Sequence, residues 1–307
     1  MKSGIAILFG FVALLCVIPL AQASEILFAT DTNGDLIVVD PILDASVRVG
    51  TNPDGISPIG IAAQGSGPSK LWVFDNGANN FFQLDNHNAT TLNTIFTSGD
   101  LSNDTVNEGD LVFTGANNGF VAGIPTFGST MTAFYSWDTT GANTTLYNGI
   151  VTGDTLAGQH AQLSGLAYCP TTIAGACVGG TLFGVEKPTD GLHLFTLNQT
   201  DGSILTSVPI TGISGSYSVG GLAINPITGQ AFVEYSNLSG TSIAAIDLAT
   251  GVTSSPFVIS HTVGVLVDGL TFADETTNVL PTPEPATAVL LCIGALALGI
   301  RRLYVRS

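Results

Sequence analysis

The chain has 307 residues, of which 45% are hydrophobic and only 10% are charged, and its formal net charge is −16. Residues 24–280 carry 22 acidic side chains against three basic ones, so this region would repel nucleic acid and anionic lipid surfaces. The region is too apolar to be disordered, and about 250 residues suffice for one large domain with a sizeable core.

The first residues have the three parts of a secretory signal peptide. Lys2 provides the positive start, residues 5–18 form a dense apolar stretch, and Ala21-Gln22-Ala23 is a small-x-small cleavage site. The sequence therefore predicts export, with residues 1–23 removed and the mature chain beginning at Ser24. A first membrane anchor is the alternative, but the apolar stretch ends too early for it.

The region after the signal peptide has the pattern of an all-β protein. No window shows a sustained 3.6-residue period; instead, short β-branched and aromatic runs alternate with Gly, Asn, Asp and Pro. The first two runs, 26–29 and 36–39, flank Asn33-Gly34, which predicts a hairpin with a type I′ turn. The acidic residues around this turn suggest a calcium loop, but the spacing and distal glutamate of an EF-hand are missing, so a plain turn is the better interpretation.

A repeat of four strands in about 45 residues runs through this region. Its clearest copy spans residues 221–259, and further copies begin at Gly165, Ile59 and Gly109. The last start, at 269–273, has no copy after it, whereas the N-terminal run 26–49 has three strands and lacks the opening one. Joining the strand at 269–273 to the strand at 26–29 completes one blade. The sequence therefore predicts a five-bladed β-propeller over residues 24–275, closed by its N- and C-terminal strands.

Two short phrases within the repeat resemble a known family. Residues 222–229 read Leu-Ala-Ile-Asn-Pro-Ile-Thr-Gly, and residues 246–251 read Ile-Asp-Leu-Ala-Thr-Gly. These phrases resemble the YVTN and quinoprotein-type propeller repeats, closely over residues 221–251 and loosely in the other blades. Such propellers include binders, scaffolds and enzymes, so the resemblance implies a fold rather than an activity.

Two of the four cysteines, Cys169 and Cys177, lie in the region expected outside the cytoplasm. A disulfide between them would close a short loop and contribute roughly 2–3 kcal/mol. The alternative is a redox or metal site, but neither cysteine has a nearby histidine or a Cys-x-x-Cys neighbour. A structural disulfide is the prediction.

The sequence contains no recognisable catalytic or cofactor-binding motif. The four histidines stand singly, without the spacing of a metal site: His87, His160, His193 and His261. Ser214 lacks the strand–turn–helix context of a nucleophile elbow. Asp110 and Asp268 lie beside opening strands that would line the channel, where a ring of acids could hold calcium, but two candidates are too few for such a ring. We therefore predict no catalytic residue, no metal and no cofactor.

The last 27 residues combine three elements in a fixed order. Pro283-Glu284-Pro285 forms a rigid turn, and residues 286–300 form an uninterrupted small and apolar run. A basic stop follows, made of Arg301, Arg302 and Arg306. This arrangement resembles the PEP-CTERM sorting tail of Gram-negative bacteria, which implies recognition and processing of the exported protein by an exosortase, a membrane-embedded cysteine protease.

A plain membrane anchor or a buried apolar helix is the alternative for this tail. The 15 residues from 286 to 300 would span only about 22 Å as a helix, less than a hydrocarbon core of about 30 Å. A short anchor suits a segment that is held briefly and then processed. We therefore divide the chain into a signal peptide (1–23), a propeller (24–275), a linker (276–285) and a transmembrane helix with a basic tail (286–307).

The predicted function is that of an exported, non-enzymatic protein of the cell envelope or extracellular matrix. The sorting resemblance implies an exosortase-like enzyme, the inner membrane and exopolysaccharide as partners. The alternative is a secreted propeller hydrolase or lactonase, which would need acids and histidines converging at one channel mouth.

Overall fold

The computed structural model describes residues 25–65, 70–75, 77–103, 106, 109–123, 132–149, 162–187, 191–213, 218–237, 240–259 and 266–274. The predicted signal peptide, the Pro-Glu-Pro linker and the C-terminal apolar segment lie outside these residues. Within them, no helix is long and apolar enough to cross a membrane. A single 3-10 turn, η1 (Leu101–Asn103), accompanies the strands of this described part.

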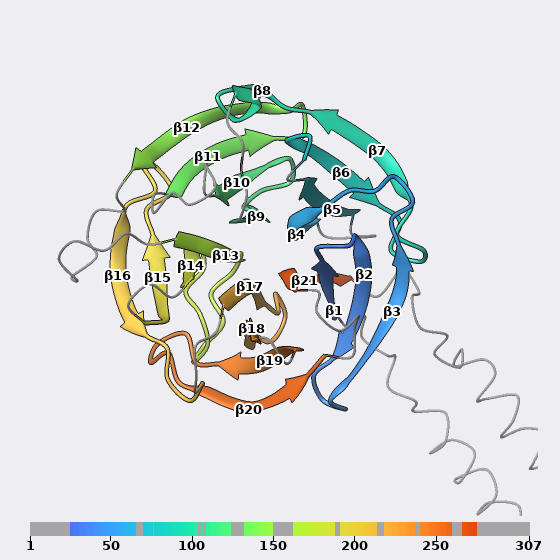
Figure 1. The fold of residues 1–307 in the computed structure, drawn as a ribbon. Coiled ribbons are helices and arrows are strands. Elements are labelled where there is room, and N and C mark those ends of the chain that lie inside the picture. Colours follow the sequence, from blue (N-terminus) through green and yellow to red (C-terminus); the bar gives the residue numbers. More distant parts are fainter. Residues whose placement is uncertain are drawn as a thin grey trace, which may run out of the picture.

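The strands form five sheets arranged in a ring around one axis (Figure 1). Blade 1 contains β21 (Val267–Asp274), β1 (Glu25–Asp31), β2 (Asp35–Asp40) and β3 (Ala45–Thr51). Blade 2 contains β4 (Pro58–Gln64), β5 (Lys70–Asp75), β6 (Asn80–Leu84) and β7 (Thr91–Phe96). Blade 3 contains β9 (Gly109–Phe113), β10 (Asn118–Gly123), β11 (Thr132–Asp138), β12 (Ala142–Gly149) and the short β8 (Ser98–Gly99).

The last two blades follow the same order from the axis outward. Blade 4 contains β13 (Gln162–Cys169), β14 (Thr181–Lys187), β15 (His193–Leu197) and β16 (Ile204–Pro209). Blade 5 contains β17 (Ser218–Ile224), β18 (Ala231–Asn237), β19 (Gly240–Ile246) and β20 (Thr253–Val258). The predicted five-bladed propeller is confirmed.

Blade 1 joins the two ends of the described chain. β21 pairs antiparallel with β1, with Ile26 opposite Ala273 and Ala29 opposite Leu270. The predicted closure is therefore confirmed. It removes the two edges that an open ring would otherwise leave unpaired.

The hydrophobic core is divided among the five blade interfaces. Each of the five buried clusters draws its residues from one pair of neighbouring blades. Leu111 and Phe113 pack towards blade 2, whereas Val112 between them packs towards blade 4. Because successive side chains of a strand point to opposite faces, both faces of every blade are buried. This explains why the strands are continuous apolar runs rather than alternating ones.

Short extensions also connect neighbouring blades near their outer strands. The Nδ2 of Asn52 donates to the carbonyl of Ala89, which joins blade 1 to blade 2. β8 follows blade 2 in the chain but pairs with β12 of blade 3. Thr211 follows blade 4 and donates to the carbonyl of Gly251 in blade 5 at 3.0 Å. These links stabilise the ring beyond the closure of blade 1.

The hairpin predicted between the first two runs is present, but its turn type is not the predicted one. Gly34 has a φ of 78°, whereas Asn33 does not have the positive φ that a type I′ turn requires. The carboxylate of Asp31 accepts hydrogen bonds from the amides of Asn33 and Asp35, at 2.9 and 3.0 Å. The side chain of Asp31 thus closes a three-residue loop in which only the glycine is left-handed.

Candidate functional site

A funnel of about 520 Å³ opens at the end of the ring where the five innermost strands finish. These strands are β4, β9, β13, β17 and β21, and each is the strand of its blade that lies nearest the axis. All five contribute side chains to the funnel wall. The volume lies within the range of about 300–1,000 Å³ that is usual for ligand pockets.

Three consecutive positions of each inner strand build the funnel wall. The deepest position holds only large aliphatic residues, namely Ile61, Leu111, Leu166, Leu222 and Leu270. The next position holds mostly small residues, namely Ala62, Val112, Ala167, Ala223 and Thr271. The position nearest the opening holds Ala63, Phe113, Tyr168, Ile224 and Phe272. The funnel is therefore aliphatic at its base and partly aromatic at its rim.

A ring of glycines closes the channel directly below the funnel. The residue before each aliphatic base residue is Gly60, Asp110, Gly165, Gly221 or Gly269. A Cβ on Gly221 would lie 2.7 Å from the amide nitrogen of Leu270, and one on Gly269 would lie 2.7 Å from that of Ile61. Neighbouring inner strands are thus too close for a side chain at four of these five positions. The funnel is therefore open at one end.

Asp110 is the only member of this ring with a side chain, and it is buried. Its carboxylate accepts hydrogen bonds from the amides of Leu111 and Leu166, both at 2.8 Å, and from Ile61. One carboxylate thus joins the inner strands of three blades. Burial raises the pKa of Asp110 well above its ordinary value, although these amide hydrogen bonds act in the opposite direction.

A second buried carboxyl, Glu234 of β18, lies beside the inner strand of blade 5, because a Cβ on Gly220 would lie 2.2 Å from its Oε2. Its Oε1 accepts a hydrogen bond of 2.6 Å from the hydroxyl of Ser236, which in turn lies 2.7 Å from that of Thr241. Burial raises the pKa of Glu234 to about 8, against the hydrogen bonds of Ser236 and Gly220. Glu234 also raises the pKa of Asp110 by charge repulsion. Burial thus favours the protonated form of both carboxyls.

The predicted channel acids do not converge on a metal site. Asp110 lies in the glycine ring, whereas Asp268 is half-buried on β21, where its backbone carbonyl accepts a hydrogen bond from Thr30. In the part of the chain that the structure describes, no three His, Cys, Asp or Glu side chains are placed to hold a metal ion.

The two described histidines lie in different settings. His87 is exposed and contacts Asp85 in the turn between β6 and β7, at the perimeter of the ring. His193 is largely buried, and its Nδ1 hydrogen bonds to the buried carboxylate of Glu186. This pair lies across β14 and β15, at the end of blade 4 opposite the funnel. His160, His261 and Ser214 lie outside the described residues.

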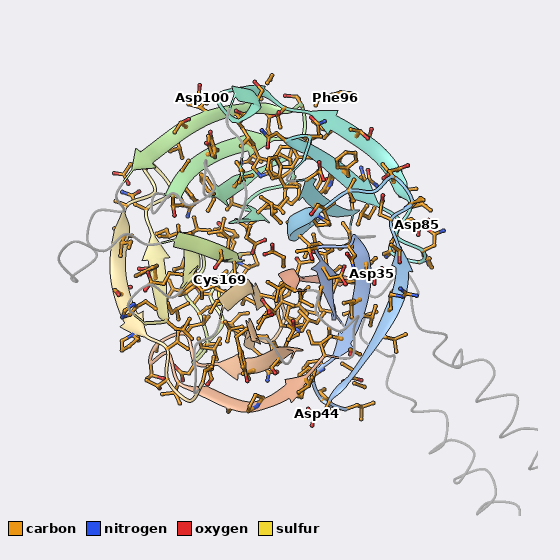
Figure 2. The ribbon with its side chains drawn as sticks, in the orientation of Figure 1. Asp35, Asp44, Asp85, Phe96, Asp100 and Cys169 are labelled. Atoms are coloured by element: carbon orange, nitrogen blue, oxygen red, sulfur yellow. A yellow bond between two sulfur atoms is a disulfide. The ribbon has the colours of Figure 1, made fainter. Side chains whose placement is uncertain are left out.

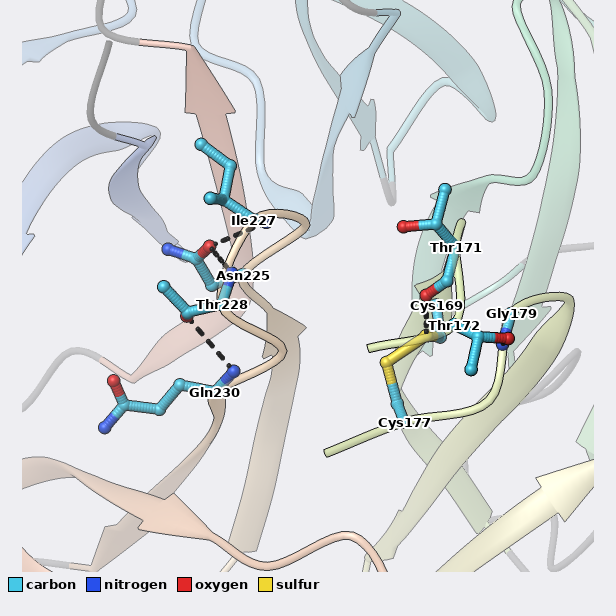
Figure 3. Close-up of a disulfide and its surroundings, with 9 residues drawn as sticks. All are labelled: Cys169, Thr171, Thr172, Cys177, Gly179, Asn225, Ile227, Thr228 and Gln230. Atoms are coloured by element: carbon cyan, nitrogen blue, oxygen red, sulfur yellow. Dashed lines mark hydrogen bonds between the residues drawn. A yellow bond between two sulfur atoms is a disulfide. The ribbon is translucent and has the colours of Figure 1, made fainter. Parts of the chain in front are cut away.

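The predicted disulfide is present, with the Cα atoms of Cys169 and Cys177 6.2 Å apart. It closes the loop between β13 and β14, beside the turn of blade 5 that begins at Asn225 (Figure 3). A Cβ on Gly229 in that turn would lie 2.5 Å from the Cβ of Ala176, so the loop and the turn are in direct contact. Pro170 and Ile227 carry these two segments into the funnel rim. The disulfide thus stabilises one side of the opening.

The funnel wall offers little reactive chemistry. Among its described residues, Glu25 is the only charged side chain, and none is a histidine, cysteine or serine. The acids Asp44, Asp85 and Asp100 lie instead at the perimeter of the ring (Figure 2). The predicted sorting residues (Pro283, Glu284, Pro285, Arg301, Arg302, Arg306) and cleavage residues (Ala21, Ala23) lie outside the described part, so they remain predictions.

Sequence reasoning did not identify the funnel or the buried carboxyls Glu186 and Glu234. A signal for Glu234 is present, because it interrupts the apolar strand Ala231–Asn237. A signal for the funnel is also present, because a glycine precedes an aliphatic residue in four of the five inner strands. Neither pattern shows that these residues meet at the axis.

No protein-family model and no curated protein matches this chain. Similar solved structures include a luciferin-regenerating enzyme, with 11% identity, a TM-score of 0.44 and 78% of each chain covered. A glutaminyl cyclase of Myxococcus xanthus has 11% identity and a TM-score of 0.47, with 80% of this chain and 84% of that chain covered. The Dos1 propeller has 11% identity and a TM-score of 0.38, with 78% of this chain and 56% of that chain covered. At these levels of similarity, the propeller assignment rests on the strand pairing described above.

Proposed function

We propose that this protein is exported and sorted through its C-terminal tail, and that its propeller is a non-catalytic binding module of the cell envelope or extracellular matrix. The observation that carries the binding role is the one-ended funnel, whose wall is largely apolar and whose described residues include one carboxylate, Glu25, and no histidine, cysteine or serine. Such a wall can hold a ligand but brings no histidine or nucleophile together with its single carboxylate.

The sorting role is carried by the order of elements in the last 27 residues. Pro283-Glu284-Pro285, the apolar run and the terminal arginines resemble the PEP-CTERM tail, and the signal peptide provides the export that such a tail requires. The proposed partners are an exosortase-like enzyme, the inner membrane during processing, and exopolysaccharide at the final location. The host would then be a Gram-negative bacterium.

The sorting proposal is tested by cell fractionation and mass spectrometry of the mature C-terminus in a host with an exosortase. The wild-type protein should leave the inner membrane and lack the residues after the Pro-Glu-Pro motif. Replacing Pro283, Glu284 and Pro285 together by alanine should hold the full-length protein in the inner membrane. Release of this triple variant, or retention of Arg306 in the mature wild-type protein, would refute the sorting proposal.

A secreted hydrolase or lactonase is the second candidate, and the pair of Glu186 and His193 favours it. A carboxylate that orients a histidine is a common part of general-base sites. This pair lies at the end opposite the funnel, so the two candidates place the ligand at different ends of the propeller. Hydrolysis of model lactones or esters by the purified protein, lost in His193→Gln but not in His87→Gln, would favour the enzyme.

A further inference from the structure

The chemistry of the funnel also indicates what kind of group it would hold, given its proposed role as the binding site. The base and middle of the funnel are aliphatic, apart from the hydroxyl of Thr271. That hydroxyl already accepts a hydrogen bond from the amide of Ala63 at 3.1 Å. A sugar ring would leave most of its hydroxyl groups without partners there, at a substantial desolvation cost. The wall therefore suits an apolar group.

The charges around the funnel have one sign. Glu25 lies on the wall, and residues 24–280 contain 22 acidic against three basic residues. None of the described wall residues is a lysine or an arginine. The field of such a protein attracts cations and repels anions over distances of about the Debye length.

The rim adds aromatic side chains at one level of the wall. Phe113, Tyr168 and Phe272 occupy the same position in three of the five inner strands. Phe113 and Phe272 are almost completely buried between blades, where they pack against Trp137 and Phe232, so Tyr168 is the rim ring with exposed surface. Aromatic rings attract cations through their quadrupole, and quaternary ammonium groups are recognised in this way.

We propose that the funnel binds a hydrophobic cation, inserted with its apolar part towards the aliphatic base and its positive charge towards Glu25 and the aromatic rim. Each part of such a ligand meets a complementary part of the wall: aliphatic residues at depth, and a carboxylate and aromatic rings near the opening. A substituted ammonium group with a compact apolar or aromatic substituent has this chemistry.

Three probes of the same shape and different charge test this proposal. Phenyltrimethylammonium, tert-butylbenzene and benzenesulfonate carry charges of +1, 0 and −1 on a phenyl ring with a tetrahedral substituent. Their binding to the full-length chain in nanodiscs of uncharged digalactosyl lipid is measured by equilibrium dialysis, with empty nanodiscs as the blank. We expect the cation to bind about 5- to 10-fold more tightly than the neutral probe, and the anion most weakly.

Three variants locate the binding and its charge preference. Ala116→Trp, at an exposed position of the rim, should weaken the binding of all three probes by about 10-fold, because the larger side chain would exclude them from the funnel. Glu25→Gln should bring the cation to within about 2-fold of the neutral probe. The matched control Asp44→Asn removes one acid from the perimeter and should change no affinity (Figure 2).

The outcomes separate this inference from the proposed function. Equal binding of the three probes, or an undiminished cation preference in Glu25→Gln, would overturn the cation proposal and leave the funnel as a binding site. Absence of binding by every probe, or binding insensitive to Ala116→Trp, would overturn both the cation proposal and the binding role of the funnel. Neither result bears on sorting, which is measured by the mass of the mature protein.

Discussion

Glu234 should make this protein less stable as the pH rises through neutrality. Its side chain is completely buried, and burial raises its pKa to about 8 from an ordinary value of 4.5. In the unfolded chain this carboxyl loses its proton near pH 4.5, whereas in the folded protein it keeps the proton until about pH 8. Between these values the unfolded state binds fewer protons, so the free energy of unfolding falls as the pH rises.

The size of the effect follows from the linkage relation. Each pH unit within this window lowers the free energy of unfolding by about 1.4 kcal/mol. The contribution of Glu234 to that free energy should therefore fall by about 4 kcal/mol between pH 5 and pH 8. Above about pH 8 both states are ionised and the contribution becomes constant. Glu234→Gln should remove this dependence, because the amide keeps an acceptor for Ser236 and cannot ionise.

Urea denaturation of the full-length chain at pH 5, 6, 7 and 8 measures the effect. The two tryptophans, Trp72 and Trp137, report unfolding because both are buried between blades 2 and 3. The wild-type free energy of unfolding should fall relative to that of Glu234→Gln as the pH rises. The matched control Asp247→Asn alters an exposed turn carboxyl whose hydrogen bonds with Thr250 lower its pKa, so it should leave the slope above pH 5 unchanged. A wild-type slope equal to that of Glu234→Gln, within about 1 kcal/mol over this range, would refute the reasoning.

Three further predictions concern the ring itself. Gly221→Ala should lower the free energy of unfolding by about 1–3 kcal/mol more than Gly77→Ala. A Cβ on Gly221 would meet the backbone of blade 1, whereas one on the exposed Gly77 would meet only the carboxylate of Asp75, at 3.4 Å; equal urea midpoints would contradict this. Leu270→Asp should prevent cooperative folding, since it places an unpaired charge at a buried position of the closing blade, and a wild-type thermal transition by circular dichroism would contradict it. Replacing Cys169 and Cys177 by serine should lower the free energy of unfolding by about 2–3 kcal/mol, as measured by urea denaturation. Free-thiol labelling of both cysteines in the unreduced exported protein would show that the disulfide is absent.

Sequence patterns were sufficient to predict the strands and the pairing of the first strand with the last. The run 26–49 lacks an opening strand and the run 269–273 lacks a following blade, so pairing β21 with β1 was the solution that left neither incomplete. The short separation of Cys169 and Cys177 likewise limited the geometry to one loop. The turn at Asn33 was predicted wrongly, because the side chain of Asp31 competes for the amides that a type I′ turn leaves free.

The all-β repeat, the number of blades and the closing pair could be predicted from the sequence, because strand periodicity, turn residues and incomplete repeats can be read along the chain. The funnel, the ring of glycines below it and the raised pKa values of Asp110 and Glu234 could not be predicted in this way. Those features depend on how closely five strands, separated by about 45–55 residues in the chain, approach one axis. Glu234 is an ordinary acidic residue in its own strand, and it becomes a neutral-pH titrating group only because the packing of blade 5 against blade 1 removes water from it.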